Sequence, residues 1–250
     1  IRSFLIGRAR KQGKIPGFQL QNPLRQAASC LPAVLELMKD EKYGLRDEDD
    51  DYLEFTSDDD GEVEPPSIHE LINHLGQLPK IIIDSKYRDF EEGLRKARQG
   101  GSNQALVFSF FTRTILYLER RLKEDGYKVK IMYGKTPSDQ RQEVMKQFRN
   151  QDFDILICSE VGSEGLDFEF CNILVNYDLP WNPQRVEQRI GRCHRYGQKH
   201  DVVVVNFVNL KNEADQRVFE LLSNKFHLFE GVFGASDEVL GAIESGVDFE

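Results

Sequence analysis

Residues 80–209 predict an α/β domain, a doubly wound parallel sheet with helices on both faces. Two observations carry this prediction. Short apolar runs alternate along this stretch with segments whose apolar residues recur at helical spacing. The apolar runs are continuous, which is typical of parallel strands that are buried on both faces. At roughly 130 residues the stretch is long enough to form one such domain.

The first 79 residues predict a connecting segment with helices and an acidic insert. Apolar spacing indicates a helix over 24–39, and the capping-box spacing from Ser67 to Glu70 indicates another over 67–78. Between them, residues 40–64 hold 13 Asp or Glu against 2 Lys or Arg, more than the whole net charge of −9. This composition favours a disordered or solvating insert that could contact a protein partner. The alternative, an acidic Mg²⁺ or Ca²⁺ loop, lacks the spacing of a calcium-binding loop.

The elements of the predicted domain follow one another in regular order. Gly100 and Gly101 separate the first helix from the first strand, and Ser138 is placed to cap the third helix. After Asn209, an apolar stripe predicts a helical extension over 210–250. The expected helices cover 84–99, 112–124, 138–149 and 183–195, and the expected strands cover 105–108, 128–132, 153–158, 173–177 and 202–207.

The last helix lies in a stretch, 182–198, that holds four arginines and a single acid in an acidic protein. Asn182 is expected to cap it and Pro183 to begin it. Because Gln188 and Arg192 are four residues apart, and Arg192 and Arg195 three, these side chains are expected to share one face. Guanidinium groups on one face suit a phosphate, whose oxygens match their fixed fork of donors. The alternative is an ordinary solvated basic face.

The other side of this helix is expected to pack on the sheet through Val186 and Ile190. Gly191 inside the helix costs about 1 kcal/mol relative to Ala, so a close approach of another backbone is expected there.

Ligands bind beyond the carboxyl ends of strands in sheets of this kind, so four loops are expected to carry the site. Within 159–167, Gly162 and Gly165 would let backbone amides approach a phosphate, and Asp167 would accept a hydrogen bond from a hydroxyl such as a ribose. The other three loops cover 109–113, 133–137 and 178–183.

A complete nucleotide site is not expected within this sequence. Gly134-Lys135-Thr136 ends like a phosphate-binding P-loop, but Val129 stands where that pattern needs glycine. No other P-loop pattern exists in the sequence, and no strand ends in an Asp-Glu pair suited to Mg²⁺. Together with a first residue that is Ile, not Met, this predicts a fragment that holds half of an active site.

The cysteines predict structural thiols and no metal site. Cys30, Cys158, Cys171 and Cys193 form no Cys-x-x-Cys pair, which fits reduced thiols in a cytoplasmic protein. Cys193 and His194 are adjacent on a helix and would point in different directions. No apolar run approaches 18 residues and no signal sequence is present, so a membrane or secretory role is not expected.

Several of these segments resemble conserved motifs of superfamily-two helicases, in the form found in the Swi/Snf family of double-stranded DNA translocases. Residues 188–198, Gln-Arg-Ile-Gly-Arg-Cys-His-Arg-Tyr-Gly-Gln, resemble motif VI, residues 159–168 resemble motif V, and residues 106–112 resemble motif IV. Asp178-Leu-Pro-Trp-Asn-Pro183 matches the segment before motif VI. The motifs stand in the expected order, and the ends of the chain look more like the RapA/HepA-like branch.

The resemblance implies the second RecA-like lobe of an ATP-dependent double-stranded DNA translocase, inactive without the first lobe of the same parent chain. ATP and Mg²⁺ would be bound mainly by that first lobe. Arg192 and Arg195 would be arginine fingers, worth roughly 10³ to 10⁵ in rate, and Gln188, Gly165 and Asp167 would help bind ATP. Contacts with the DNA backbone are implied for Ser109, Thr112, Ser159, Gly162 and Trp181.

This sequence departs from the motif V pattern in two places. Glu160 replaces a basic residue, so one DNA-backbone contact is expected to be lost, and Asp167 stands where Asn is common. Two alternative functions remain: an RNA helicase lobe, and a non-catalytic protein-interaction module that retains the fold.

Overall fold

The computed structural model describes residues 29–33, 84–99, 103–180, 182–208, 216 and 219–220. The helix expected over 67–78, the acidic insert over 40–64 and nearly all of the extension over 210–250 lie outside the described residues. Among the described residues, no helix is both long and apolar enough to cross a membrane.

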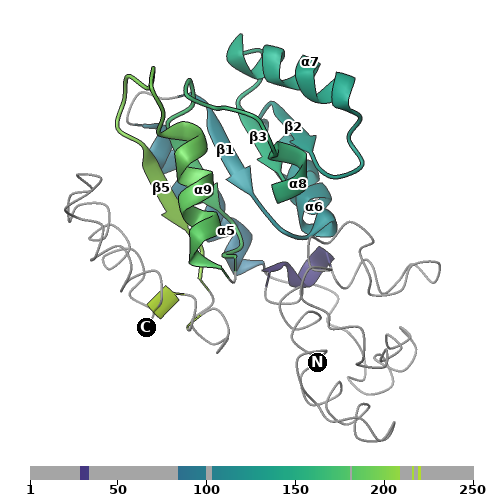
Figure 1. The fold of residues 1–250 in the computed structure, drawn as a ribbon. Coiled ribbons are helices and arrows are strands. Elements are labelled where there is room, and N and C mark those ends of the chain that lie inside the picture. The colour runs from purple at the N-terminus through teal and green to yellow at the C-terminus, as the bar shows by residue number, and fades with distance from the viewer. Residues whose placement is uncertain are drawn as a thin grey trace, which may run out of the picture.

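Five parallel strands form one sheet in the order β2-β3-β1-β4-β5. Helices cover both faces of this sheet, and this confirms the predicted α/β class (Figure 1). The strands are β1 (Ala105–Phe108), β2 (Val129–Met132), β3 (Ile155–Cys158), β4 (Ile173–Asn176) and β5 (Val203–Asn206). The helices are α5 (Ser85–Arg98), α6 (Thr112–Glu124), α7 (Ser138–Arg149), α8 (Glu160–Ser163) and α9 (Pro183–Cys193).

The two faces of the sheet build two separate cores, because successive strand residues point to opposite faces. In β1, for example, Val107 joins the core with α5 and α6, whereas Leu106 and Phe108 join the core with α7 and α9. β1, β3 and β4 are buried at every position, as expected for the central strands of a covered parallel sheet. Cys30 and Ala33 of the preceding segment also belong to the core on the α5 and α6 side.

The helix ends differ from prediction in three places. Ser138 does not cap α7, because Pro137 takes the cap position and Ser138 is the first helical residue. The expected loop after β3 contains a single helical turn, α8, capped by the Ser159 hydroxyl. Asn182 caps α9 as predicted, but α9 ends at Cys193, so Arg195 belongs to the following turn.

Candidate nucleotide and nucleic-acid site

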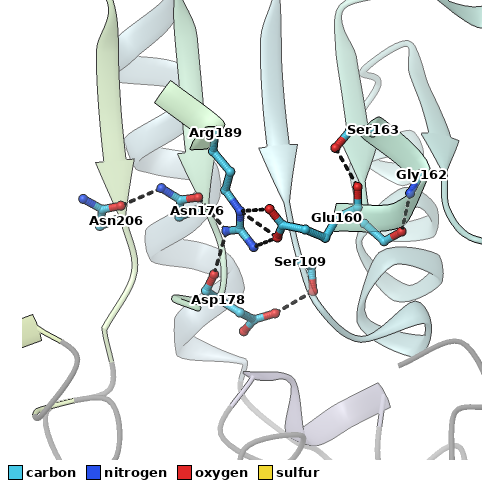
Figure 2. A network of polar contacts seen from close by, with 9 residues as sticks. Ser109, Glu160, Gly162, Ser163, Asn176, Asp178, Arg189 and Asn206 are labelled. Atoms are coloured by element: carbon cyan, nitrogen blue, oxygen red, sulfur yellow. Dashed lines mark hydrogen bonds and ion pairs between the residues drawn. The ribbon is translucent and has the colours of Figure 1, made fainter. Parts of the chain in front are cut away.

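A fully buried arginine, Arg189, lies at the carboxyl ends of the central strands (Figure 2). Its Nη2 forms an ion pair with the Glu160 carboxylate at 2.6 Å, and its Nε donates to the same carboxylate at 3.1 Å. Nη1 donates to the Asn176 side-chain oxygen at 2.7 Å and to the Asp178 backbone oxygen at 3.2 Å. A buried cation is tolerated only where charge and hydrogen bonds compensate it, and both are present here.

Aromatic rings complete the surroundings of this guanidinium. The rings of Phe108 and Phe110 lie 4.8 and 5.0 Å from it, within the range of cation–π attraction. Arg189 therefore joins α9 to β1, β4 and α8 at one point.

The contacts of Arg189 continue into three further side-chain pairs. The Asp178 carboxylate accepts a hydrogen bond from the Ser109 hydroxyl at 2.5 Å and pairs with Lys86 at 3.2 Å. The Asn176 amide nitrogen donates to the Asn206 side-chain oxygen at 2.7 Å. Figure 2 shows that the ends of β1, β4 and β5 are connected through these side chains.

The short helix α8 is held by three arginines from two neighbouring helices. A single turn has too few internal hydrogen bonds to be stable alone, so outside donors fix its position. Arg141 comes from α7, and Arg189 and Arg192 come from α9. Their acceptors are the Val161 oxygen at 3.0 Å from Arg141, the Glu160 carboxylate for Arg189, and the Ser163 and Leu166 oxygens at 2.8 and 3.2 Å from Arg192.

Gly162 is required where α8 packs against the end of β2. A Cβ at this position would lie 2.6 Å from the Met132 carbonyl carbon and 2.7 Å from the Tyr133 Cα, too close for any side chain. Its amide donates to the Ser159 hydroxyl at 3.0 Å. The glycine thus serves close packing of two backbones, and its amide is already bonded within the lobe.

The outer side of α9 is built differently from its inner side. Gln188 and Gly191 are exposed, and Arg192 is partly exposed, with a buried Nε that has no hydrogen-bond partner among the described residues. Arg195, in the turn after the helix, is 50% exposed and pairs with Asp167, which is 51% exposed. The sequence predicted that Gln188, Arg192 and Arg195 share one face of the helix. Because Arg195 lies in the turn after the helix, this holds for Gln188 and Arg192 only. Both proposed fingers retain solvent access, although each has a partner within the lobe.

Two glycines of this region have different surroundings. A Cβ on Gly191 would meet nothing within 4 Å in the described residues, so the expected close backbone approach does not occur inside the lobe. Gly165 has a φ of 72°, which is the left-handed region that glycine adopts at little cost. It sets the path of the exposed loop that carries Asp167.

Four of the five residues expected to contact DNA are buried in the described lobe. Ser109 is fully buried with its hydroxyl on Asp178, and Ser159 caps α8. Thr112 is 6% exposed, and its hydroxyl has no partner within the described residues. Gly162 is buried, and Trp181 lies outside the described residues. Their role in DNA binding stays a prediction.

The described cysteines lie in the buried cores, as expected for structural thiols. All four are free and buried. Burial raises the pKa of the Cys158 thiol, and the hydrogen bond with Cys171 together with burial raises the pKa of the Cys193 thiol. Thiols with raised pKa values are poor nucleophiles. Within the part of the chain that the structure describes, no group of three or more His, Cys, Asp or Glu is arranged to hold a metal.

Sequence reasoning missed the pairing of Glu160 with Arg189. Arg189 stands three residues after Val186, so helical spacing places it on the packing side of α9, and this signal was available. Glu160 was expected only as the loss of a basic contact. Its actual partner lies on another element, and the spacing within either segment does not reveal it.

Comparison with known proteins agrees with this geometry. Residues 85–197 match the model of the helicase conserved C-terminal domain. The ATP-dependent helicase YqhH of Bacillus subtilis, described as uncharacterised, is 34% identical over 191 residues, which cover 74% of this chain and 33% of YqhH. The RNA polymerase-associated protein RapA of Vibrio campbellii is 39% identical over 112 residues, 44% of this chain and 12% of RapA.

Two further similarities are to a curated helicase and to a solved structure. The ATP-dependent RNA helicase fal1 of Schizosaccharomyces pombe is 34% identical over 105 residues, 42% of this chain and 26% of fal1. The crystal structure of the C-terminal part of the Fun30 ATPase domain superposes with a TM-score of 0.51 at 25% identity, covering 57% of this chain and 47% of that one. The chain spans a third or less of the length of these curated relatives. Residues 85–197 therefore form a helicase conserved C-terminal domain with a RecA-like fold, and over this stretch the chain is similar to YqhH, to RapA and to the C-terminal part of the Fun30 ATPase domain.

Proposed function

We propose that this chain is the second motor lobe of an ATP-dependent double-stranded DNA translocase of the Swi/Snf family. The observation that carries the proposal is the outer side of α9 and the turn after it, where Gln188, Arg192 and Arg195 keep solvent access beside the exposed Asp167. An ATP-dependent motor needs cations at the edge of this lobe that can reach a phosphate bound by the first lobe.

Arg195 is the principal arginine finger in this proposal. Its pairing with Asp167 joins two half-exposed side chains, and such pairs contribute only about 0–1 kcal/mol. A phosphate, which carries more charge, can therefore replace Asp167 as the partner of Arg195. Asp167, once released, would be free to accept a hydrogen bond from a ribose hydroxyl.

Arg192 acts beside Arg195 in this proposal. Its Nη1 donates to two carbonyl oxygens of the α8 region, and its side chain is partly exposed. A permanently charged guanidinium with solvent access suits an anionic ligand. When bound between the lobes, ATP with Mg²⁺ would supply the phosphoryl group and the free energy for movement.

The first test is Arg195→Ala in the protein that joins this chain to its first lobe. ATP turnover is expected to fall about 10³-fold or more, with an unchanged unfolding curve, because a positive charge near the transferring phosphoryl group is lost. Arg149→Ala is the matched control, because Arg149 is also an exposed arginine, paired with Glu169 at 2.9 Å. Near-normal turnover in Arg195→Ala would reject the finger assignment.

The second test concerns the isolated 250 residues. With no P-loop in the sequence, we expect no nucleic-acid-stimulated ATP hydrolysis and no tight ATP binding from this chain alone. Measurable turnover that rises on addition of duplex DNA would contradict this.

The nucleic-acid substrate has one specific competitor. The similarity to fal1 favours an RNA helicase lobe, whereas the segment Asp178–Pro183 resembles the double-stranded DNA translocases. Stimulation of ATP turnover by duplex DNA of mixed sequence, compared with single-stranded and duplex RNA at one salt concentration, decides between them.

A further inference from the structure

The buried pair of Glu160 and Arg189 connects two parts of the lobe to which the proposed function gives different tasks. Arg189 lies on α9, three residues before Arg192 and six before Arg195. Glu160 begins α8, whose cap Ser159 and whose Gly162 stand in the segment expected to contact nucleic acid. The shortest contact between the two side chains is 2.6 Å, and the Arg189 side chain has no solvent exposure.

Glu160 is the charged partner on which this arrangement depends. The other described acceptors of Arg189 are neutral oxygens of Asn176 and Asp178. The Asp178 carboxylate is engaged elsewhere, with Ser109 and Lys86. Without Glu160, a guanidinium enclosed by Phe108 and Phe110 would keep its charge but lose its counter-charge, and α9 would have to shift to hydrate it.

A shift of α9 at this point would move both proposed fingers. Arg189 and Arg192 are one helical turn apart, so rotation or translation at Arg189 is passed directly to Arg192 and to the turn that carries Arg195. Displacement of a catalytic group by about 1 Å costs on the order of 10²-fold in rate.

We propose that Glu160 is a positioning residue for ATP hydrolysis: by pairing with the buried Arg189 it holds α9 where Arg192 and Arg195 reach the nucleotide. This rests on the proposed function. It also gives Glu160 a task different from that of the basic residue which the Swi/Snf pattern has at this place. The carboxylate faces into the lobe, and nucleic acid is not its partner.

The experiment uses the protein that joins this chain to its first lobe. The double variant Glu160→Gln with Arg189→Met removes both buried charges while keeping side chains of similar length, so it avoids an unpaired charge. Glu160→Asp retains the charge on a shorter arm. Glu119→Gln is the control, because Glu119 also forms an ion pair with a cation, Lys123 at 2.7 Å, on the distant surface of α6.

The double variant is expected to fold cooperatively and to lose about 100-fold in kcat for ATP, because it lacks the polar contacts that tie α9 to Glu160, Asn176 and the Asp178 backbone. Its KM for ATP and its Kd for nucleic acid are expected to stay those of the control, because most ATP contacts lie in the first lobe and Glu160 touches no nucleic acid. The kcat of Glu160→Asp is expected to lie between that of the double variant and that of the control. A folded double variant with the kcat of the control overturns the proposal, and so does a loss confined to nucleic-acid affinity.

Two further outcomes are decisive. If the double variant does not fold, Glu160→Asp decides, and a kcat equal to that of the control overturns the proposal. If the unaltered protein hydrolyses no ATP, the proposed function fails, and hydrogen exchange then tests the positioning alone. Amides of α9 should exchange faster in Glu160→Asp than in the control, with α5 unchanged; equal rates in α9 overturn it.

Discussion

The inner side of α9 and the turn that follows this helix use the same residue type in opposite ways. On the inner side, Arg189 has no solvent exposure and is bonded to Glu160, Asn176 and the Asp178 backbone. At the outer end, Arg195 is half exposed and pairs with Asp167. The difference teaches that burial, and not the count of arginines, separates the cation that builds the lobe from the cation that is available to a ligand.

The largest expected difference is in stability. Arg189→Ala leaves the Glu160 carboxylate, whose side chain is 14% exposed, without its partner; breaking a fully buried pair costs about 3–5 kcal/mol, so a loss of about 3 kcal/mol is expected here. Arg195→Ala removes an exposed pair and should cost about 0–1 kcal/mol. Urea unfolding of the two variants measures the contrast. Equal losses of stability would break the comparison between the two sides of the helix.

The second prediction extends the comparison to glycines. Gly162→Ala should destabilise the lobe by about 1–3 kcal/mol, because the new methyl group would overlap the backbone of Met132 and Tyr133. The midpoint of urea unfolding is the measurement. If Gly162→Ala were neutral, α8 would have more freedom to move than its three arginine contacts indicate.

The third prediction is a gain in stability from a substitution on the outer side of α9. Gly191→Ala should stabilise the lobe by about 0.5–1 kcal/mol, because a helical glycine is replaced where the Cβ meets nothing. In the complete protein, the same substitution should lower ATP turnover if the first lobe docks on this surface. A stability loss in the isolated chain would show that Gly191 has a packing role within the lobe.

The smallest expected effect belongs to the exposed pair. Asp167→Asn should change stability by no more than about 1 kcal/mol, and the difference should vanish at about 1 M salt, where exposed charges are screened. Thermal unfolding at low and high salt measures it. A difference that persisted at high salt would mean that Asp167 and Arg195 are less accessible than their half-exposed side chains indicate.

The sheet could be predicted from local patterns because its strands carry continuous apolar runs, as in Ile155–Cys158, and this signal needs no knowledge of their neighbours. The cap of α9 was also local, since Asn182 and Pro183 stand side by side. The predicted cap of α7 was wrong, because Pro137 takes the N-cap position, one residue before the predicted cap Ser138.

The candidate site was predicted less completely, for a physical reason. The buried role of Glu160 depends on Arg189, which lies on another helix, and the spacing within α8 contains no trace of it. The reason for Gly162 was likewise hidden in the backbone of β2. Motif order located the segments of the site, whereas the tasks of individual side chains depended on contacts between those segments.

The strand order has a consequence for how the chain folds during its synthesis. β1 is made first but lies at the centre of the sheet, where Ala105 pairs with Ile155 of β3 and Leu106 with Leu174 of β4. A nascent chain that has reached α7 thus holds an apolar strand with neither neighbour yet made, and such non-local pairing folds slowly. A nascent chain that stalls on the ribosome before β4 is made would expose this apolar strand and be prone to aggregate. Chaperone binding to the nascent chain should therefore be strongest between the synthesis of β1 and that of β4.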